Sequence, residues 1–378
     1  MKLGFLRDLY QADGYRDGSG FVSVYLDTSP TESARKEVGL RWRAARSELA
    51  EAGADVLTLD AVADEVTGRP PHGPGLAVFA RDGAVRLARS LPWRPRDEIS
   101  RYAPLPHMMP LLEQQDRAAA HVRVSATRPG ARLLTCPEYG NYGEITVEGQ
   151  QWPVHKVSQG GLSERHLQRS VEETWAENAK RIADATAHAA QDVRAEFVLV
   201  GGDEWERTAV IDALPEAVRE SAVIVDREVE PDSAPFNEAA EAETARRRAA
   251  QAYARLDDLR ARISRPDPGE RRAVEGLDGT FAALRAGLAD SVVINKYTPS
   301  WVQSAWAGPN LADAAVSAEQ LRGLGVEHPF RDRADAILAR AVCGTEAELL
   351  FLPGDADPPA GGIGALLRAP ASAASDAP

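Results

Sequence analysis

The sequence predicts a mixed α/β protein that is divided into three domains. The chain has 378 residues, which is too long for one ordinary hydrophobic core. Its 44% hydrophobic and 27% charged residues are typical of a globular protein and exclude a disordered one. Strand-like segments first follow one another and later alternate with helical segments, which is the pattern of sheets that carry helices on their faces.

The first predicted domain, residues 1–115, has an α+β pattern. Its expected elements are a strand at 21–28, helices at 32–52 and 55–67, and strands at 76–80 and 85–90. The last two strands flank Asp82-Gly83, a pair of residues that favours the tight turn of a β-hairpin. Prolines are frequent between residues 92 and 110, so we expect an extended connection there and the end of the domain nearby.

The second predicted domain, residues 116–265, combines strands with long helices. The expected strands are 118–126, 131–136, 144–148, 196–200 and 222–225, and the expected helices are 163–191, 204–214 and 237–263. On the first helix, apolar or small residues recur every three or four positions, with one polar member. They predict one buried helical face that consists of Leu167, Val171, Trp175, Asn178, Ile182, Ala185 and Ala189.

The third predicted domain, residues 266–370, follows a linker of proline, aspartate and glycine at 266–269. Its expected helices are 271–289, 314–324 and 330–342, and its expected strands are 291–295, 348–351 and 361–368. The small residues of the last segment, 371–378, predict a disordered tail.

The charge distribution limits the class of partner. A formal net charge of −13 argues against free, non-specific binding to nucleic acid. Basic residues nevertheless cluster at 81–101 and at 35–46, where Arg41, Arg43 and Arg46 lie on a predicted helix. The acidic residues concentrate at 196–243. Such a chain can dock on a structured polyanion through its basic patches while the acidic parts face away.

Several classes of site and location are not indicated by the sequence. No apolar run approaches the roughly 18 residues of a membrane-spanning helix, and the first ten residues lack the apolar core of a signal peptide. We therefore expect a cytoplasmic protein without membrane contact. Histidines and cysteines show no metal-binding spacing, so no metal or cofactor is predicted. Cys136 and Cys343 are expected to be buried thiols in different domains.

The principal candidate site is the segment that joins the strands of the middle domain to its long helix. Gly160 and Gly161 permit close approach of the backbone to a phosphate or a base, and Ser163 can cap the helix. Basic residues flank the glycines and are opposed only by Glu164; they are Lys156, Arg165 and Arg169. The two arginines are one helical turn apart. These features fit a polyanion-binding loop and, equally well, a solvated helix end behind a flexible loop.

Other chemistries have weaker patterns. Residues 198–203 place two glycines between a strand and a helix but lack both phosphate-binding motifs, so a plain turn is expected. Residues 160–164 superficially resemble the nucleophile elbow of a serine hydrolase, but its last glycine is missing. Glu172 and Glu173 are adjacent and do not share a helix face, so we expect solvated carboxylates.

The order of these motifs resembles the archaeal and eukaryotic peptide-release-factor family, which includes Pelota, bacterial members and the Vms/Ankzf-type peptidyl-tRNA hydrolases. In that family a glycine pair lies between a sheet and a long helix, and a serine and a basic–aromatic pattern follow. Gly160-Gly161 match the glycines and Ser163 matches the serine, while His166, Leu167 and Arg169 occupy the basic–aromatic positions. Segments 21–27, 152–156 and 333–342 look like those of actinobacterial members, the group of the hibernation factor Balon.

The resemblance implies a ribonuclease-H-like middle domain and a C-terminal α/β sandwich like the kink-turn-binding ribosomal proteins. One departure bears on activity. Release factors carry a glutamine directly after the two glycines, and this position is Leu162 here. Leucine cannot orient a water molecule by hydrogen bonding. Gln159 lies before the glycines, and the anionic Glu164 would enter a phosphate-rich site unfavourably. We therefore expect little or no peptidyl-tRNA hydrolysis.

The resemblance thus implies a monomeric translation factor that occupies the ribosomal A site as a hibernation or stress factor. Its expected contacts with ribosomal RNA are Lys156, Gly160, Gly161, Leu162, Ser163, Arg165 and Arg169, and its expected contacts with the small subunit are Arg41, Arg43 and Arg46. Elongation factor Tu or the stalk-base proteins would bind the C-terminal domain. Two alternatives stay open: a hydrolase that rescues stalled ribosomes through Gln159 or Glu164, and a protein-binding stress factor that does not act on the ribosome.

Overall fold

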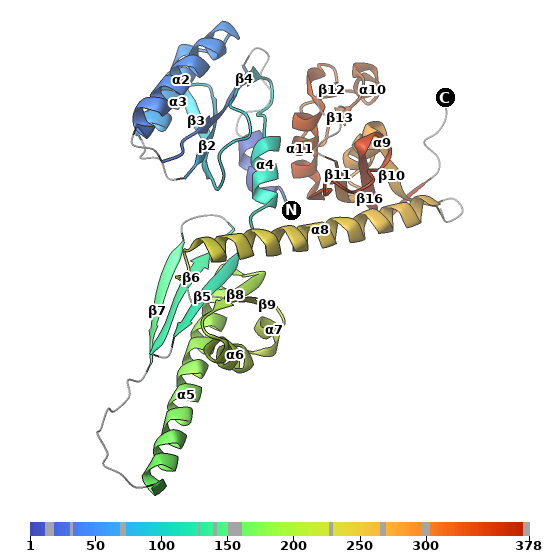
Figure 1. Ribbon diagram of the computed structural model, residues 1–378. Coiled ribbons are helices and arrows are strands. Elements are labelled where there is room, and N and C mark those ends of the chain that lie inside the picture. Colours follow the sequence, from blue (N-terminus) through green and yellow to red (C-terminus); the bar gives the residue numbers. More distant parts are fainter. Residues whose placement is uncertain are drawn as a thin grey trace. The chain divides into compact units, whose positions relative to one another are not determined.

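The computed structural model describes residues 1–11, 19–30, 33–68, 73–127, 129–138, 142–149, 161–226, 230–264, 270–295 and 303–372 (Figure 1). The predicted mixed α/β fold is confirmed, with several sheets and with helices packed on them. Contacts divide the chain into two compact units: Met1–Asp116 with Arg248–Pro378, and Arg117–Arg247. Among the described residues, no helix is long and apolar enough to cross a membrane. The division into three domains stays a prediction.

The N-terminal segment of the first unit contains an antiparallel sheet of order β3-β2-β1-β4. Its strands are β1 (Phe21–Asp27), β2 (Gly75–Arg81), β3 (Ala84–Leu91) and β4 (Ile99–Ala103), and its helices are α2 (Ala34–Glu51) and α3 (Val56–Gly68). Val22 and Val24 of β1 share a core with Trp42 of α2. Asp82 (φ 50°) and Gly83 (φ 72°) have the left-handed backbone of a primed hairpin turn, so the predicted hairpin is confirmed.

The C-terminal segment of the same unit contains two sheets, of order β10-β16-β11-β15 and β13-β12-β14. The strands are β10 (Glu270–Glu275), β11 (Ala289–Ile294), β12 (Ser304–Ala307), β13 (Ala314–Ala315), β14 (Phe330–Arg333), β15 (Glu348–Phe351) and β16 (Ile363–Ser372). The helices are α9 (Gly276–Arg285), α10 (Ala318–Gly323), α11 (Ala334–Thr345), the short η3 (Ala360–Gly362) and the second half of α8 (Ala234–Ser264). Residues 373–378, most of the expected tail, lie outside the described residues.

These two segments of the first unit share a hydrophobic core. Leu3 and Leu6, next to and within the short helix η1 (Gly4–Leu6), belong to one buried cluster with Ile337 of α11. The cluster also includes residues of α1 (Arg7–Gln11) and α4 (Met109–Asp116). The ammonium group of Met1 donates to the carbonyl oxygen of Leu349 over 2.6 Å. The beginning and the end of the chain therefore stabilise each other.

Two predicted helices of the C-terminal segment are wrong in their first turns. Residues 270–275 form β10 and not the start of a helix at 271, and residues 330–333 form β14 and not the start of a helix at 330. The first half of the helix expected at 314–324 is also replaced, because Ala314–Ala315 is a strand. β10 and β14 pair with strands far away in the sequence, β16 and β12, whereas β13 pairs with the nearby β12. Pairing between strands therefore overrides the local helical pattern.

The second unit is one five-stranded sheet of order β7-β6-β5-β8-β9, with helices on both faces. Its strands are β5 (His121–Thr127), β6 (Gly130–Cys136), β7 (Gly143–Glu148), β8 (Phe197–Gly201) and β9 (Ala222–Val225). Strands β7, β6 and β5 are antiparallel, whereas β5, β8 and β9 are parallel. Helices α5 (Gly161–Val193) and α6 (Glu204–Ala213) cover one face, α8 begins over the other, and α7 (Glu216–Arg219) precedes β9. This layered arrangement agrees with the prediction for the middle domain.

Candidate functional site

The candidate loop is only partly within the described residues. Lys156, Gln159 and Gly160 lie outside them. Gly161 is the first residue of α5, two positions before the helix start that we expected at Ser163. Residues 161–173 are described as helical backbone, and this stretch, which we call the helical arm, contains five further predicted site positions: Leu162, Ser163, Glu164, Arg165 and Arg169. Gly161, the second glycine of the pair, therefore lies at the start of the helix.

The helical arm is the beginning of an unusually long helix. Helix α5 has 33 residues, which corresponds to about 50 Å at 1.5 Å per residue. Among the side chains described for α5, the buried ones begin at Asn178. Gly161 precedes Asn178 by 17 positions, or roughly 25 Å along the helix axis. Figure 1 shows the first turns of α5 extending beyond the sheet of the second unit. The fold thus places Gly161 at the far end of a long helix.

The C-terminal half of α5 is firmly anchored on the sheet. Ile182 and Ala189 are 2% and 1% exposed and pack against β5, β6 and β8 in one cluster, so this half of the predicted helical face is confirmed. Trp175 lies edge-on against Trp205 of α6, with ring centroids 4.5 Å apart. Asn178, the polar member of the face, is 4% exposed. The helical arm therefore continues from a helix whose C-terminal half is anchored on the sheet of the second unit.

The turn between β8 and α6 does not have the geometry of a phosphate site. Gly202 has φ 141° and passes close to the carbonyl of Ala126, where a side chain would collide. Asp203 caps α6: its Oδ1 accepts from the backbone N–H groups of Trp205 and Glu206, both over 3.0 Å. A carboxylate therefore occupies the position that a bound phosphate would need at this helix N-terminus. This geometry favours the plain turn that we expected for residues 198–203.

The cap gives a first testable expectation. Replacement of Asp203 by alanine should lower the free energy of unfolding of the second unit by about 1 kcal/mol, because two N–H groups lose their acceptor. Urea denaturation followed by tryptophan fluorescence measures this change. Glu204→Ala is the matched control, because Glu204 is exposed in the same turn and has no capping hydrogen bond among the described contacts. Equal loss in both variants would contradict the assignment of the cap.

A buried polar cluster, which no sequence pattern indicates, lies beside α8 in the second unit. Arg123 Nε donates to His121 Nε2 over 3.0 Å, and His121 Nδ1 lies 2.8 Å from the carbonyl oxygen of Ala119. Burial lowers the pKa of His121 to about 4, so the ring is neutral and carries its proton on Nδ1. Arg123 Nη1 also donates to Asn237 Oδ1 over 2.6 Å and to the carbonyl oxygen of Pro231. The cluster fixes α8 to the central strand β5.

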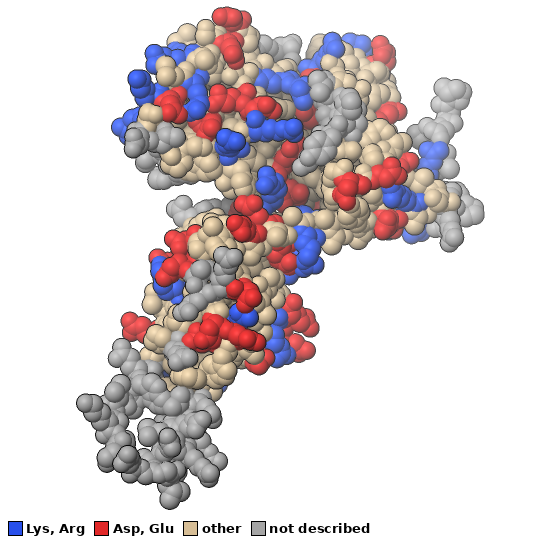
Figure 2. Space-filling model, in the orientation of Figure 1, with Lys and Arg blue, Asp and Glu red and all other residues tan. Residues whose placement is uncertain are grey.

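The predicted basic patch of the N-terminal segment is partly neutralised. Arg41 Nε lies 2.9 Å from Glu98 Oε1, and Arg46 Nη2 lies 2.7 Å from Asp60 Oδ1. Arg43 donates to a backbone carbonyl of its own helix. Figure 2 shows acidic side chains interspersed with basic ones over the N-terminal segment on the face in view. Exposed pairs of this kind contribute little to stability, so a polyanion can displace them, but the net attraction is smaller than the sequence suggested.

The cysteines are buried thiols, as predicted. Cys136 lies in the second unit and Cys343 in the first, and both are free. Burial raises the pKa of each thiol to about 11, which leaves little reactive thiolate at neutral pH. Across the described ranges, no group of three or more histidine, cysteine, aspartate or glutamate residues has the arrangement of a metal site.

Comparison with known proteins finds one matching family model and two similar mycobacterial proteins. Residues 120–265 match the model of bacterial archaeo-eukaryotic release factor family 2. Two proteins of Mycobacterium tuberculosis, from the strains CDC 1551/Oshkosh and H37Rv and both named as uncharacterized, are 28% identical to the chain over 370 residues. Each alignment covers 96% of this chain and 96% of the relative.

Solved structures show weaker likeness over the whole chain. Pelota of Archaeoglobus fulgidus is 16% identical, with 78% of this chain and 84% of that chain covered and a TM-score of 0.36. Archaeal Pelota in a model of its ribosome-bound complex with ABCE1 is 14% identical, with 97% and 94% covered and a TM-score of 0.39. The region that matches the family model covers nearly all of the second unit and the whole of α8, and it contains the glycine pair and the helical arm. Residues 120–265, which include most of the second unit, are therefore similar to bacterial archaeo-eukaryotic release factor family 2.

Proposed function

We propose that this protein is a ribosome-binding factor that occupies the A site as a hibernation or stress factor. The observation that carries the proposal is the placement of Gly161 at the start of a 33-residue helix, roughly 25 Å before its first described buried residue. A glycine at the end of a long helix can enter a narrow site that the body of the protein cannot. The family match over the same residues supports this interpretation.

In this proposal the tip of the helical arm contacts ribosomal RNA near the peptidyl-transferase centre. The contacts come from Lys156, Gly160, Gly161, Leu162, Ser163, Arg165 and Arg169. Arg165 and Arg169 are one turn apart on helical backbone, so both guanidinium groups can approach the same stretch of RNA. Guanidinium groups bind phosphate oxygens in a bidentate manner, which suits them to an RNA backbone.

The proposed factor does not hydrolyse peptidyl-tRNA efficiently. The position after the glycine pair, where release factors carry their glutamine, is Leu162, and an aliphatic side chain offers no donor or acceptor to an attacking water. The factor would therefore occupy the site without releasing the nascent peptide. This is the behaviour of a protein that protects or silences a ribosome.

The remaining contacts are proposed from the resemblance. Arg41, Arg43 and Arg46 would face the small subunit, where RNA phosphates would exchange with Glu98 and Asp60. The C-terminal segment would bind elongation factor Tu or the stalk-base proteins. The factor would act as a monomer in the cytoplasm, where ribosomes are.

Sedimentation through sucrose tests the proposal. The purified chain should sediment with 70S ribosomes at low salt, and Arg165→Glu/Arg169→Glu should weaken this binding on the order of 100-fold, because two attractive phosphate contacts become repulsive. Lys180→Glu/Arg181→Glu is the matched control, since both residues are exposed on the same helix and the change in charge is identical. A chain that stays at the top of the gradient would overturn the ribosomal function. Equal loss in both double variants would overturn the role of the helical arm.

A further inference from the structure

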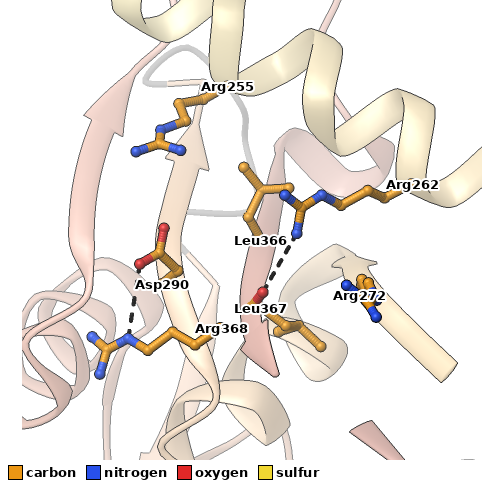
Figure 3. Close-up of a pocket in the computed structure, with 7 residues that line it drawn as sticks. All are labelled: Arg255, Arg262, Arg272, Asp290, Leu366, Leu367 and Arg368. Atoms are coloured by element: carbon orange, nitrogen blue, oxygen red, sulfur yellow. Dashed lines mark hydrogen bonds and ion pairs between the residues drawn. The ribbon is translucent and has the colours of Figure 1, made fainter. Parts of the chain in front are cut away.

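We infer that a cavity in the first unit, between α8 and the sheet β10-β16-β11, binds a phosphate group of an RNA backbone. The cavity has a volume of about 380 Å³ and is lined by Arg255, Arg262, Arg272, Asp290, Leu366, Leu367 and Arg368 (Figure 3). This inference rests on the proposed ribosomal function and adds a second RNA contact, far in the sequence from the helical arm. None of these residues belonged to the predicted site.

The fold directs four arginines to one place. Arg255 and Arg262 come from α8, Arg272 from β10 and Arg368 from β16 (Figure 3). The strand register shifts between Arg271 and Ala273 and again between Ala289 and Ser291, on the two strands that flank β16. Such irregularities redirect side chains out of the regular alternation of a sheet. The two shifts occur at Arg272 and at Asp290, so the irregular register explains why both side chains line the cavity.

The apolar base of the cavity holds this arrangement rigid. Leu366 is 2% exposed and packs with Leu256 and Leu259 of α8 in one cluster. Arg368 lies two positions further along β16, where the alternation of a strand returns a side chain to the same face. Burial of the leucines therefore fixes the distance between α8 and β16, and with it the separation of the arginines that line the cavity.

The arginines are positioned by partners that leave donors available. Arg255 Nη2 lies 3.8 Å from Glu348 Oε2, and Arg368 Nε lies 3.9 Å from Asp290 Oδ1; both separations exceed the length of a hydrogen bond. Glu348 already accepts from Gln251 over 2.8 Å. Arg368 Nη2 also donates to the carbonyl oxygen of Thr345 over 3.2 Å. A phosphate oxygen can therefore take the N–H groups of Arg255 and the Nε–H of Arg368 without breaking a short contact.

Arg262 has a different role. Its Nε and Nη2 each donate over 2.8 Å to one oxygen of Asp258, which lies one turn earlier on α8. Its Nη1 faces the carbonyl oxygen of Leu367 at 3.5 Å. This side chain is preorganised, so it can contribute positive potential to the cavity at little further entropic cost.

The balance of charge favours an anion. The lining carries four arginines and one aspartate, a sum of +3, in a chain whose net charge is −13. An acidic protein that retains a cationic cavity on a rigid base has a local attraction for negative groups.

The chemistry of the lining selects a backbone phosphate over a nucleotide base. The lining consists of arginine, aspartate and leucine, and it includes no aromatic side chain for stacking and no amide for reading a base edge. The side chains of Arg255, Arg262 and Arg368 are 39%, 35% and 41% exposed, so the site opens to solvent and does not enclose a small ligand. An RNA duplex can present a phosphate to such a site from outside.

Fluorescence anisotropy with a labelled RNA hairpin of about 20 base pairs and the full-length chain tests this inference. Arg255→Ala/Arg368→Ala should weaken binding roughly tenfold or more and should reduce the slope of log K against log salt by about two, because each contact releases about one counterion. The matched control is Arg260→Ala. Arg260 lies on the same helix, is 42% exposed and pairs with Asp357 outside the cavity. Its replacement should leave both the affinity and the slope unchanged.

The possible outcomes separate this inference from the proposed function. Hairpin binding that is unchanged in the double variant would overturn the cavity as an RNA site. If micromolar pyrophosphate or ATP displaces the hairpin from the wild-type cavity, the ligand of the cavity is a free phosphate compound and not RNA. This result would also overturn the inference. If wild-type protein binds the hairpin through the cavity but does not sediment with ribosomes, the cavity inference holds and the ribosomal proposal fails.

Discussion

Replacement of Asp332 by alanine should lower the free energy of unfolding of the first unit by about 3–5 kcal/mol, the largest effect that we expect from a single substitution. The Asp332 side chain is 0% exposed, and its carboxylate pairs with the guanidinium group of Arg101. Its Oδ2 also accepts from the backbone N–H of Leu105 over 2.8 Å. One carboxylate therefore joins the N-terminal segment to β14 of the C-terminal segment.

The physical reason is the burial of the partners that would remain. Burial raises the pKa of Asp332 despite the neighbouring Arg101, so the ionised pair gains little by itself relative to water. Loss of only the carboxylate leaves the charge of Arg101 and the N–H of Leu105 without their acceptor, and this uncompensated burial is the main cost.

Urea denaturation of three variants separates these contributions. Asp332→Ala should be strongly destabilised, whereas Arg101→Met/Asp332→Leu should recover much of the loss, because it removes both charges together. Asp357→Ala, at a carboxylate whose side chain is 91% exposed, should change stability by less than about 0.5 kcal/mol. A change of that small size in Asp332→Ala would show that the two segments of the first unit do not depend on this contact.

Acidification should destabilise both units by about 3 kcal/mol each between pH 6.5 and pH 4. His107 in the first unit and His121 in the second have pKa values lowered to about 4 from an ordinary value of 6.5, chiefly because burial disfavours the charged ring. For His107 this burial outweighs the attraction of Asp335, whose Oδ2 lies 3.9 Å from Nδ1. In this pH range the unfolded chain binds more protons than the folded chain. Stability therefore falls as the pH is lowered and levels off near pH 4.

Urea denaturation at a series of pH values measures this dependence. His121→Gln should flatten the profile of the second unit, since it removes the titrating ring and keeps an acceptor for Arg123. His188→Gln, which replaces an exposed histidine on α5, is the control and should leave the profile unchanged. A profile that is the same in wild type and His121→Gln would contradict the burial of a neutral imidazole beside Arg123.

The parts of the fold that the sequence predicted correctly have strong local signals. The hairpin at Asp82-Gly83 requires left-handed backbone, which these two residue types tolerate. The C-terminal half of α5 shows helical periodicity, and Ile182 and Ala189 are buried as that periodicity requires. Local sequence was sufficient where the chain forms an element from neighbouring residues.

The parts that were wrong or missed depend on distant residues. Strand β14 looks helical because it continues directly into α11, and only its pairing with β12 makes it a strand. Arg123 interrupts an apolar strand, but its partner Asn237 is more than a hundred positions away. The arginines of the cavity are spread from residue 255 to residue 368, and each alone looks like an ordinary surface residue. No spacing rule connects such groups before the fold brings them together.

The candidate loop stays a prediction, and it rests on neighbouring residues. Its glycine pair, its basic residues and the helix after them are consecutive, so their order can be compared directly with a family pattern. The structure adds the length of the helix that begins at Gly161 and the position of its anchored half.

Peptide release from stalled ribosome–nascent-chain complexes is the most direct test of the central claim, that the protein binds the ribosomal A site without hydrolysing peptidyl-tRNA. The purified chain should bind these complexes in sedimentation and leave the nascent peptide attached to tRNA, at the level of a reaction without the protein. Rapid release that disappears with Gln159→Ala or Glu164→Ala would contradict the claim and would establish a peptidyl-tRNA hydrolase instead.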